Sequence, residues 1–153
     1  MSNYVRGEGN ANAKLFVLGE APGESEDIAQ RPFVGPSGEL VTEMVELAGV
    51  NRRDCWVSNV CKYRPPDNDI KRLSEIGIDL KTEIENLWTE IKSINPNCIL
   101  ALGNTALEAT THFKGIINYR GSILESINYF PKVVPTLHPA NLLHQKGGEI
   151  SNY

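Results

Sequence analysis

The chain lacks long apolar segments, a positive charge excess and paired cysteines. No stretch approaches the roughly 18 consecutive apolar residues that suggest a membrane-spanning helix, so we expect no contact with a membrane. The opening MSNYVRGEGNANAK has no apolar core typical of a signal peptide, which predicts a cytoplasmic protein. Hydrophobic residues make up 41% and charged residues 22% of the 153 residues, an ordinary globular balance that excludes a disordered or low-complexity protein.

The three cysteines, Cys55, Cys61 and Cys98, form no CxxC motif. Zinc and iron–sulfur sites usually contain closely spaced cysteine pairs, so we predict no metal site. Cys98 lies in the apolar run CILALG, and we expect all three residues to be reduced and buried. Reduced structural thiols are typical of a cytoplasmic protein.

Acidic residues outnumber basic ones by 19 to 15, and the net charge is −4. This balance argues against general binding of polyanions. Residues 52–72, here called the basic segment, nevertheless carry a net charge of +3. Its basic residues are Arg52, Arg53, Lys62, Arg64, Lys71 and Arg72. The basic segment is either an ordinary solvated stretch or a local surface that faces phosphate groups, and charge alone does not separate these readings.

Strand-like apolar runs alternate with stretches of helical periodicity. The predicted strands are 14–19, 55–60, 98–103 and 132–137, and the predicted helices are 37–49, 74–94 and 104–113, with a hairpin or irregular pair over 116–130. Ser37 and Gly49 are expected to cap the first helix, and Asn104 the last. The alternation predicts one α/β domain over residues 1–153, a three-layer α/β/α sandwich with a central, mostly parallel four-stranded sheet.

Polar, turn-rich segments follow three of the predicted strands. GEAPGESED begins at Gly19, KYRPPDND comes soon after Asn59, and HPANLL begins at His138. The carboxyl ends of parallel strands meet at one edge of a sheet, where open α/β folds bind their ligands. The sequence therefore predicts a site at this edge.

Each of these motifs also has an ordinary structural explanation. GEAPGESED can be a solvated acidic turn, although its carboxylates also suit proton transfer or water activation. Phe33 can fill the core or offer a stacking face to a nucleobase. A lone histidine such as His138 is more often structural than catalytic, and Leu142 and Leu143 can pack inside or wedge into a base stack.

Taken together, the motifs resemble the uracil-DNA glycosylase superfamily, and its family 4 most closely. The matching segments are GEAPGESED, RPFVGPSGEL, SNVCKYRPPDN, LGNTAL and HPANLL, in that order and at similar intervals between residues 5 and 144. The combination is specific, although each motif alone is weak. The resemblance implies an enzyme of base excision repair that flips uracil out of DNA, hydrolyses the N-glycosidic bond and leaves an abasic site.

The resemblance also implies roles for single residues. Phe33 would stack on the uracil ring, and Asn59 would pair with O4 and N3, where cytosine presents the opposite pattern of donor and acceptor. His138 would donate a hydrogen bond to O2, where negative charge develops as the base departs. Glu20 would orient the attacking water and stabilise the sugar cation, with Glu26 as the second candidate for this role.

Seven further residues complete the predicted site. The backbone of Ala21 would line the sugar side of the pocket beside Glu20, and Gly19 would also contact the substrate. Asn68 matches a family position near the site. Arg64, Pro65, Leu142 and Leu143 are expected to contact DNA. Family 1 enzymes have an aspartate where Ala21 stands and a tyrosine where Gly23 stands. The water-activating group therefore has to differ in this chain, and thymine exclusion has to come from another residue or be weaker.

Family 4 members hold a [4Fe–4S] cluster on four cysteines, and this chain departs from that pattern. Tyr63 and Thr82 stand near two of the cysteine positions, so we predict no cluster and no other cofactor. The expected partner is uracil-containing DNA, single- or double-stranded, bound by a monomer.

Two alternatives remain open from the sequence, and a third is disfavoured. The chain could be a non-catalytic binder of DNA or of a modified base, or a glycosylase for another deaminated or modified base. A nucleotide- or flavin-binding module is disfavoured, because no GxGxxG motif is present.

Overall fold

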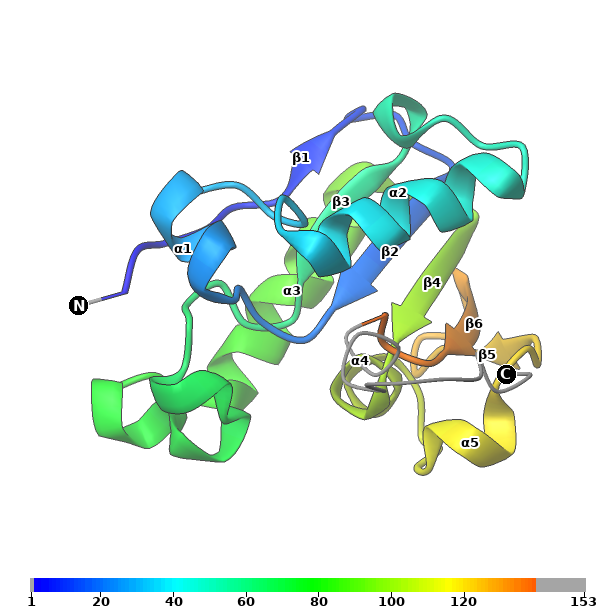
Figure 1. Cartoon of the computed structure of the whole chain (residues 1–153). Coiled ribbons are helices and arrows are strands. Elements are labelled where there is room, and N and C mark those ends of the chain that lie inside the picture. The colour runs from blue at the N-terminus through cyan, green and yellow to red at the C-terminus, as the bar shows by residue number, and fades with distance from the viewer. Residues whose placement is uncertain (1, 140–153) are drawn as a thin grey trace.

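A six-stranded sheet forms the centre of the computed structural model, which describes residues 2–139 (Figure 1). The strand order is β1-β3-β2-β4-β6-β5. The strands are β1 (Glu8–Gly9), β2 (Leu15–Gly19), β3 (Trp56–Asn59), β4 (Cys98–Leu102), β5 (Leu124–Glu125) and β6 (Lys132–Thr136). The four inner strands are parallel, and β1 and β5 add antiparallel edges. The parallel core matches the prediction, but the sheet has six strands rather than four, because two-residue edge strands leave no periodic pattern in a sequence.

Helices and 3-10 turns connect the strands. The α-helices are α1 (Glu24–Ala29), α2 (Pro36–Leu47), α3 (Leu80–Ile94), α4 (Asn104–Thr110) and α5 (Ile116–Tyr119). The 3-10 helices are η1 (Arg52–Asp54), η2 (Pro66–Asn68) and η3 (Ile70–Ile76). None of the helices among residues 2–139 has both the length and the apolarity needed to span a bilayer.

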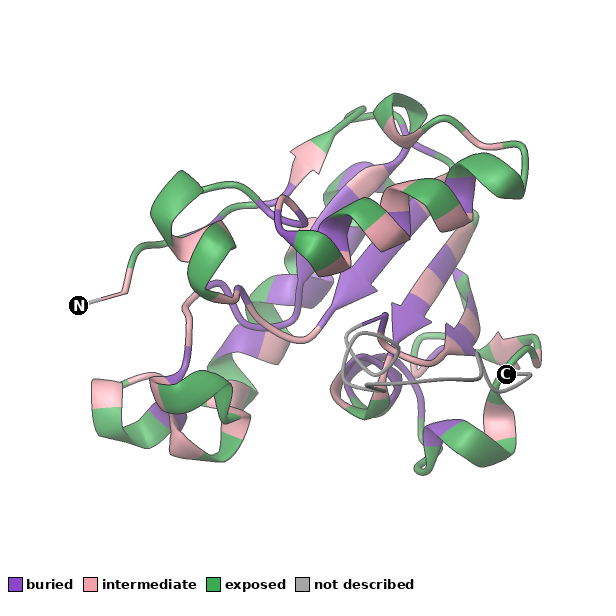
Figure 2. Cartoon of the chain, viewed as in Figure 1, coloured by how far each residue is buried: buried purple, intermediate pink, exposed green. Residues whose placement is uncertain are grey.

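Alternate residues of the central strand β2 face two separate apolar clusters. Phe16 and Leu18 pack with Leu87 of α3, whereas Val17 packs with Val41 of α2. Figure 1 shows α2 in front of the sheet and α3 behind it, and Figure 2 shows the inner strands as the most buried part of the chain. Burying each such side chain contributes about 1.5–3 kcal/mol. This arrangement is the predicted three-layer α/β/α sandwich.

The predicted helix over 74–94 is two elements. Gly77, with φ +75°, ends η3 in the left-handed region, and α3 begins only at Leu80. The carboxylate of Asp79 accepts the backbone N–H of Thr82 and caps α3. Ile78 lies between the two elements and continues the apolar pattern, so periodicity alone does not reveal the break.

Three further local predictions differ from the structure. The N-cap of α2 is Gly35 rather than Ser37. At its other end Gly49 follows Ala48 with φ +85°, the left-handed glycine expected to end this helix. The N-cap of α4 is Gly103. Asn104 instead accepts the backbone N–H of Ile116 at 2.8 Å, which ties α4 to α5. Residues 116–130 are not a hairpin, because they form α5 and then β5, which pairs with β6.

Candidate active site

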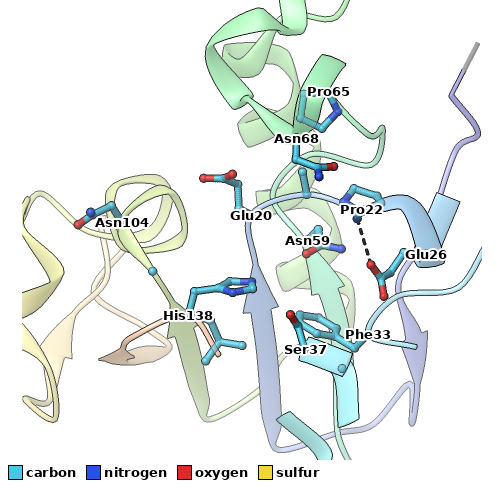
Figure 3. Close-up of a pocket in the computed structure, with 15 residues that line it drawn as sticks. Glu20, Pro22, Glu26, Phe33, Ser37, Asn59, Pro65, Asn68, Asn104 and His138 are labelled. Carbon is cyan, nitrogen blue, oxygen red and sulfur yellow. Dashed lines mark hydrogen bonds between the residues drawn. The ribbon is translucent and has the colours of Figure 1, made fainter. Parts of the chain in front are cut away.

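A cavity of about 500 Å³ opens at the carboxyl ends of the parallel strands (Figure 3). Eight residues that the sequence singles out line it: Glu20, Ala21, Glu26, Phe33, Asn59, Pro65, Asn68 and His138. Gly19 lies directly behind the Asn59 and Phe33 side chains. Leu142 and Leu143 lie outside the described residues. The predicted position of the site, at the carboxyl edge of the sheet, agrees with this arrangement.

Asn59 is the last residue of β3 and is only 3% exposed. Parallel pairing places it beside Gly19, and the β2–β3 contact continues beyond the strands, since Cys61 N–H donates to Glu20 O at 2.9 Å. The Nζ of Lys62 donates to the backbone carbonyl of Asn59. No group among residues 2–139 hydrogen-bonds the Asn59 side-chain amide. Its donor and its acceptor are therefore both available to a ligand.

Phe33 lies in the loop before α2. The residue is 5% exposed, and its backbone is left-handed at φ +53°. The chain is closely packed around it. A Cβ on Gly19 would lie 2.8 Å from Cζ of Phe33 and 2.6 Å from Oδ1 of Asn59. A Cβ on Gly38 would lie 2.0 Å from the carbonyl carbon of Phe33. Both glycines are therefore required for the ring to sit beside the Asn59 amide.

Glu26 accepts hydrogen bonds from three backbone N–H groups. Its Oε1 accepts from Gly23 at 3.1 Å, and its Oε2 accepts from Val34 at 3.1 Å and from Gly35 at 2.8 Å. A carboxylate at the N-terminal end of α2 is also favoured by the helix dipole. The Glu26 carboxylate therefore ties the loop after β2 to the loop that carries Phe33. Because both of its oxygens accept these bonds, Glu26 is less suited than Glu20 to activating water.

Glu20 follows β2 and is partly exposed in the cavity wall. The hydroxyl of Thr105 in α4 donates a hydrogen bond to its Oε2. Within the described part of the chain, Oε1 has no hydrogen-bond partner. One carboxylate oxygen is thus fixed by the protein while the other can accept a proton or orient a water molecule.

His138 comes two residues after the end of β6 and is partly buried. Its ring points from the β6 side towards Asn59 and Phe33 (Figure 3). Burial lowers the pKa of His138 from its usual 6.5, and the negative charge of Glu26 partly opposes that shift. The imidazole is therefore neutral near pH 7 and keeps one N–H donor.

The basic segment is not a continuous phosphate-facing surface. Lys62 forms a buried ion pair with Glu90 at 2.9 Å. Arg72 pairs with Glu75 at 2.6 Å and also with Asp67. Arg72 makes these ion pairs at the surface, whereas the partly buried Arg52 donates to the carbonyls of the Phe33 loop. Lys62 and Arg52 are therefore committed to internal contacts and are not part of a phosphate-facing surface. For the other basic residues of the segment, the phosphate-facing interpretation stays a prediction.

Arg64 and Pro65 lie at the edge of the cavity, where the sequence expects contact with DNA. Pro65 is buried and lines the cavity, and the partly exposed Arg64 donates from Nε to Oδ1 of Asn68 at 2.9 Å. Asn68 has a left-handed backbone, with φ +59°. The Arg64 guanidinium therefore holds the Asn68 side chain at the cavity rim.

Sequence reasoning missed Arg52 and Thr105, which hold predicted site residues in place. Arg52 was visible only as one member of a charge cluster, and Thr105 only as part of LGNTAL. Neither residue type carries a local signal for its partner, because both contacts join segments distant in the chain.

The thiols do not fit an iron–sulfur cluster. Such clusters are held by four thiolates or a near equivalent. Cys55 and Cys61 lie at opposite ends of β3, and their Sγ atoms contact the carbonyls of Asn51 and Tyr63 at 3.6 and 3.2 Å. Burial raises the pKa of Cys61 to about 11. Among residues 2–139, no three histidine, cysteine or acidic side chains come together as metal ligands.

Comparison with known proteins agrees with the geometry. The sequence profile described as the Uracil DNA glycosylase superfamily matches residues 6–153. A Type-4 uracil-DNA glycosylase of Thermotoga maritima is 39% identical over 151 residues, covering 97% of this chain and 76% of that protein. Proteins of the same name from Archaeoglobus fulgidus and Saccharolobus solfataricus are 34% and 36% identical, covering 94% and 93% of this chain and 74% and 68% of their own. The chain therefore belongs to the uracil-DNA glycosylase superfamily.

Proposed function

We propose that this protein hydrolyses the N-glycosidic bond of deoxyuridine in DNA, releasing uracil and leaving an abasic site. The observation that carries the proposal is the meeting of Glu20, Phe33, Asn59 and His138 in one cavity, from four separate parts of the chain. An aromatic face, an available amide, a neutral imidazole and a carboxylate are the groups that recognition and removal of a flipped pyrimidine require.

Recognition of the base rests on Phe33 and Asn59. The Phe33 ring offers a stacking face, which accepts any base. The Asn59 amide supplies selectivity, because its N–H pairs with O4 of uracil and its carbonyl with N3–H. Cytosine would place donor against donor and acceptor against acceptor, leaving buried polar groups unpaired.

Cleavage rests on His138 and Glu20. As the bond breaks, negative charge develops on O2 of uracil and positive charge on the sugar. The N–H of the neutral His138 stabilises the departing base, and a preorganised donor of this kind is often the largest contribution to the rate. Glu20 stabilises the sugar cation and orients the water that adds to it.

We propose that no iron–sulfur cluster takes part, because the thiols present do not form a suitable ligand set. Metal analysis of protein purified without oxygen should find no stoichiometric iron, and titration in denaturant should find three free thiols. Stoichiometric iron would contradict this. Because every group of the proposed site belongs to one chain, we also propose that the protein acts as a monomer. We further propose that it acts in the cytoplasm, on single- or double-stranded DNA.

The deciding experiment is a single-turnover assay with a labelled oligonucleotide that contains one uracil. The protein is in excess, and alkali reveals abasic sites. We expect strand cleavage by the wild type, with large losses for Asn59→Ala and His138→Ala. The matched controls Asn86→Ala and His112→Ala change exposed residues and should retain activity.

A second candidate function follows from Gly23, which lines the cavity without a side chain. A glycosylase for another altered base would use the same site. A panel of oligonucleotides with hypoxanthine, xanthine or modified uracils tests this. Folded protein that binds DNA but cleaves none of the panel would instead be a non-catalytic binder.

A further inference from the structure

We propose that Arg52 is the positioning residue that holds Phe33 in place as the base-stacking surface. This inference rests on the proposed function and assigns a role to a residue outside the cavity wall. Arg52 lies in η1, before β3, whereas Phe33 lies in the loop before α2.

The Arg52 guanidinium makes two hydrogen bonds to the loop that carries Phe33 and one to helix α2. Its Nη1 donates to the carbonyl of Phe33 at 2.7 Å and to Oγ1 of Thr42 at 2.9 Å. Its Nη2 donates to the carbonyl of Pro32 at 2.9 Å. Two successive carbonyls of the loop are thus bound by one planar group, which sets the orientation of both peptide planes.

The acidic partner of Arg52 is itself held in place. Glu8 lies 3.6 Å from Nη2 of Arg52 and forms a two-pronged ion pair with Arg31, at 2.8 and 3.1 Å. Arg31 is two residues before Phe33 in the same loop. The loop is therefore fixed at Arg31 through Glu8, and at Pro32 and Phe33 directly.

The backbone at Phe33 needs such support. A left-handed conformation is uncommon for an aromatic residue and persists where surrounding contacts enforce it. Gly19 and Gly38 pack closely against Phe33, so a small rotation of the backbone would turn the ring away from the Asn59 amide. Arg52 supplies charge-assisted bonds that oppose this rotation.

A lysine cannot replace this contact. Arginine presents several donors in a fixed planar fork, whereas the lysine ammonium is a compact charge on a flexible chain. Arg52→Lys keeps the charge but loses the simultaneous bonds to Pro32, Phe33 and Thr42. A role in attracting phosphate would survive this substitution, whereas a role in orienting the loop would not.

The test is a double-mutant cycle on cleavage of uracil-containing DNA. Arg52→Ala, Phe33→Ala and the double variant are compared with the wild type, and Arg6→Ala serves as an exposed arginine control. We expect Arg52→Ala to lower kcat/KM by about tenfold, a typical effect of weakened stacking on one base. In the Phe33→Ala background the same change should cost less than about twofold.

Two measurements keep a folding defect separate from the proposed role. Thermal melts report whether each variant is folded, and if Arg52→Ala is not, Arg52→Lys takes its place in the cycle. Added methylguanidinium should restore part of the activity of Arg52→Ala and none of that of Phe33→Ala. Equal losses from the Arg52 variant in both backgrounds would overturn the proposal, because the residue would then act independently of the ring.

Binding of free uracil, followed by NMR, separates failure of this inference from failure of the proposed function. An active wild type whose Arg52 variants bind uracil normally would refute the positioning role alone. A folded wild type that neither cleaves uracil DNA nor binds uracil would refute both.

Discussion

The hydroxyl of Thr105 donates a hydrogen bond to the carboxylate of Glu20 and so connects α4 to the loop after β2. The two residues are 85 positions apart in the sequence. The bond restricts Glu20 to one orientation, with one oxygen occupied and the other available at the cavity. In the proposed reaction, Thr105 thereby determines where the water-orienting oxygen lies.

Replacing Thr105 with valine keeps the side-chain shape and removes the donor. We expect Thr105→Val to slow single-turnover cleavage by about tenfold, in the range of one hydrogen bond to a charged group, with little change in DNA affinity. Thr105→Ser keeps the hydroxyl and should cleave at nearly the wild-type rate. Equal rates for the valine variant and the wild type would mean that Glu20 needs no orientation.

His138 should make stability depend on pH below 6.5. Burial lowers its folded-state pKa from 6.5, so below that pH the unfolded chain takes up a proton that the folded chain does not. The free energy of unfolding should therefore fall with acidification, by at most about 1.4 kcal/mol per pH unit from this residue, and be unaffected by it at higher pH.

Urea unfolding between pH 5 and 8 checks this expectation, with His138→Gln as the comparison. The acid-side loss should be smaller in the variant than in the wild type. An NMR titration of the His138 ring should give a midpoint below 6.5. If the free energy of unfolding falls with the same slope against pH in both proteins, the folded state does not disfavour the protonated form of His138.

Arg64 should contribute to DNA affinity without affecting base choice. Its side chain lies at the cavity rim beside Asn68, where a flipped nucleotide would carry its phosphates. Arg64→Ala should weaken binding of uracil-containing and uracil-free oligonucleotides by the same factor. The slope of the logarithm of the binding constant against the logarithm of salt concentration should become shallower by about one.

Asn68→Ala is the control for the Arg64 substitution, because it removes the same hydrogen bond and keeps the cation. Fluorescence anisotropy at several salt concentrations measures both variants. A loss confined to uracil-containing DNA would show that Arg64 acts on the base rather than on phosphate.

Asn59→Asp should create activity on cytosine. A protonated or ionised carboxyl group at this position can accept from N4 of cytosine, which the amide N–H of asparagine opposes. We expect slow but measurable release of cytosine together with a large loss of uracil cleavage. Asn59→Leu, which has no polar group, should lose both activities, and absence of any cytosine release by the folded Asp variant would mean that Asn59 does not read this edge.

The sequence predicts the central sheet and most of the cavity wall because both depend on local patterns. Apolar runs mark β2 and β4, and a polar motif follows each strand that contributes to the site. The supporting contacts are not local. Whether Arg52 faces solvent or the Phe33 loop depends on how η1 packs against α2, and the sequence alone left the basic segment open to a phosphate role.

The start of α3 shows a different limit. The apolar pattern runs through Ile78 without a break, and only the left-handed turn at Gly77 separates the two helices. A glycine within a helical pattern is tolerated often enough that it does not by itself mark a boundary. The two-residue strands β1 and β5 were missed because their pairing depends on the strands beside them.

β6 pairs with β4 on one side and only with the two-residue β5 on the other. His138 follows β6, whereas Phe33 and Asn59 depend on β2, β3 and α2. β6 is thus the last of the four parallel strands. In the proposed reaction, transient detachment of β6 would remove the donor to the leaving base while the residues proposed to hold the base stay assembled. A molecule opened in this way would still bind an extruded base but would not cleave its N-glycosidic bond. Raised temperature and mild denaturant should therefore abolish base release before they abolish binding of uracil-containing DNA.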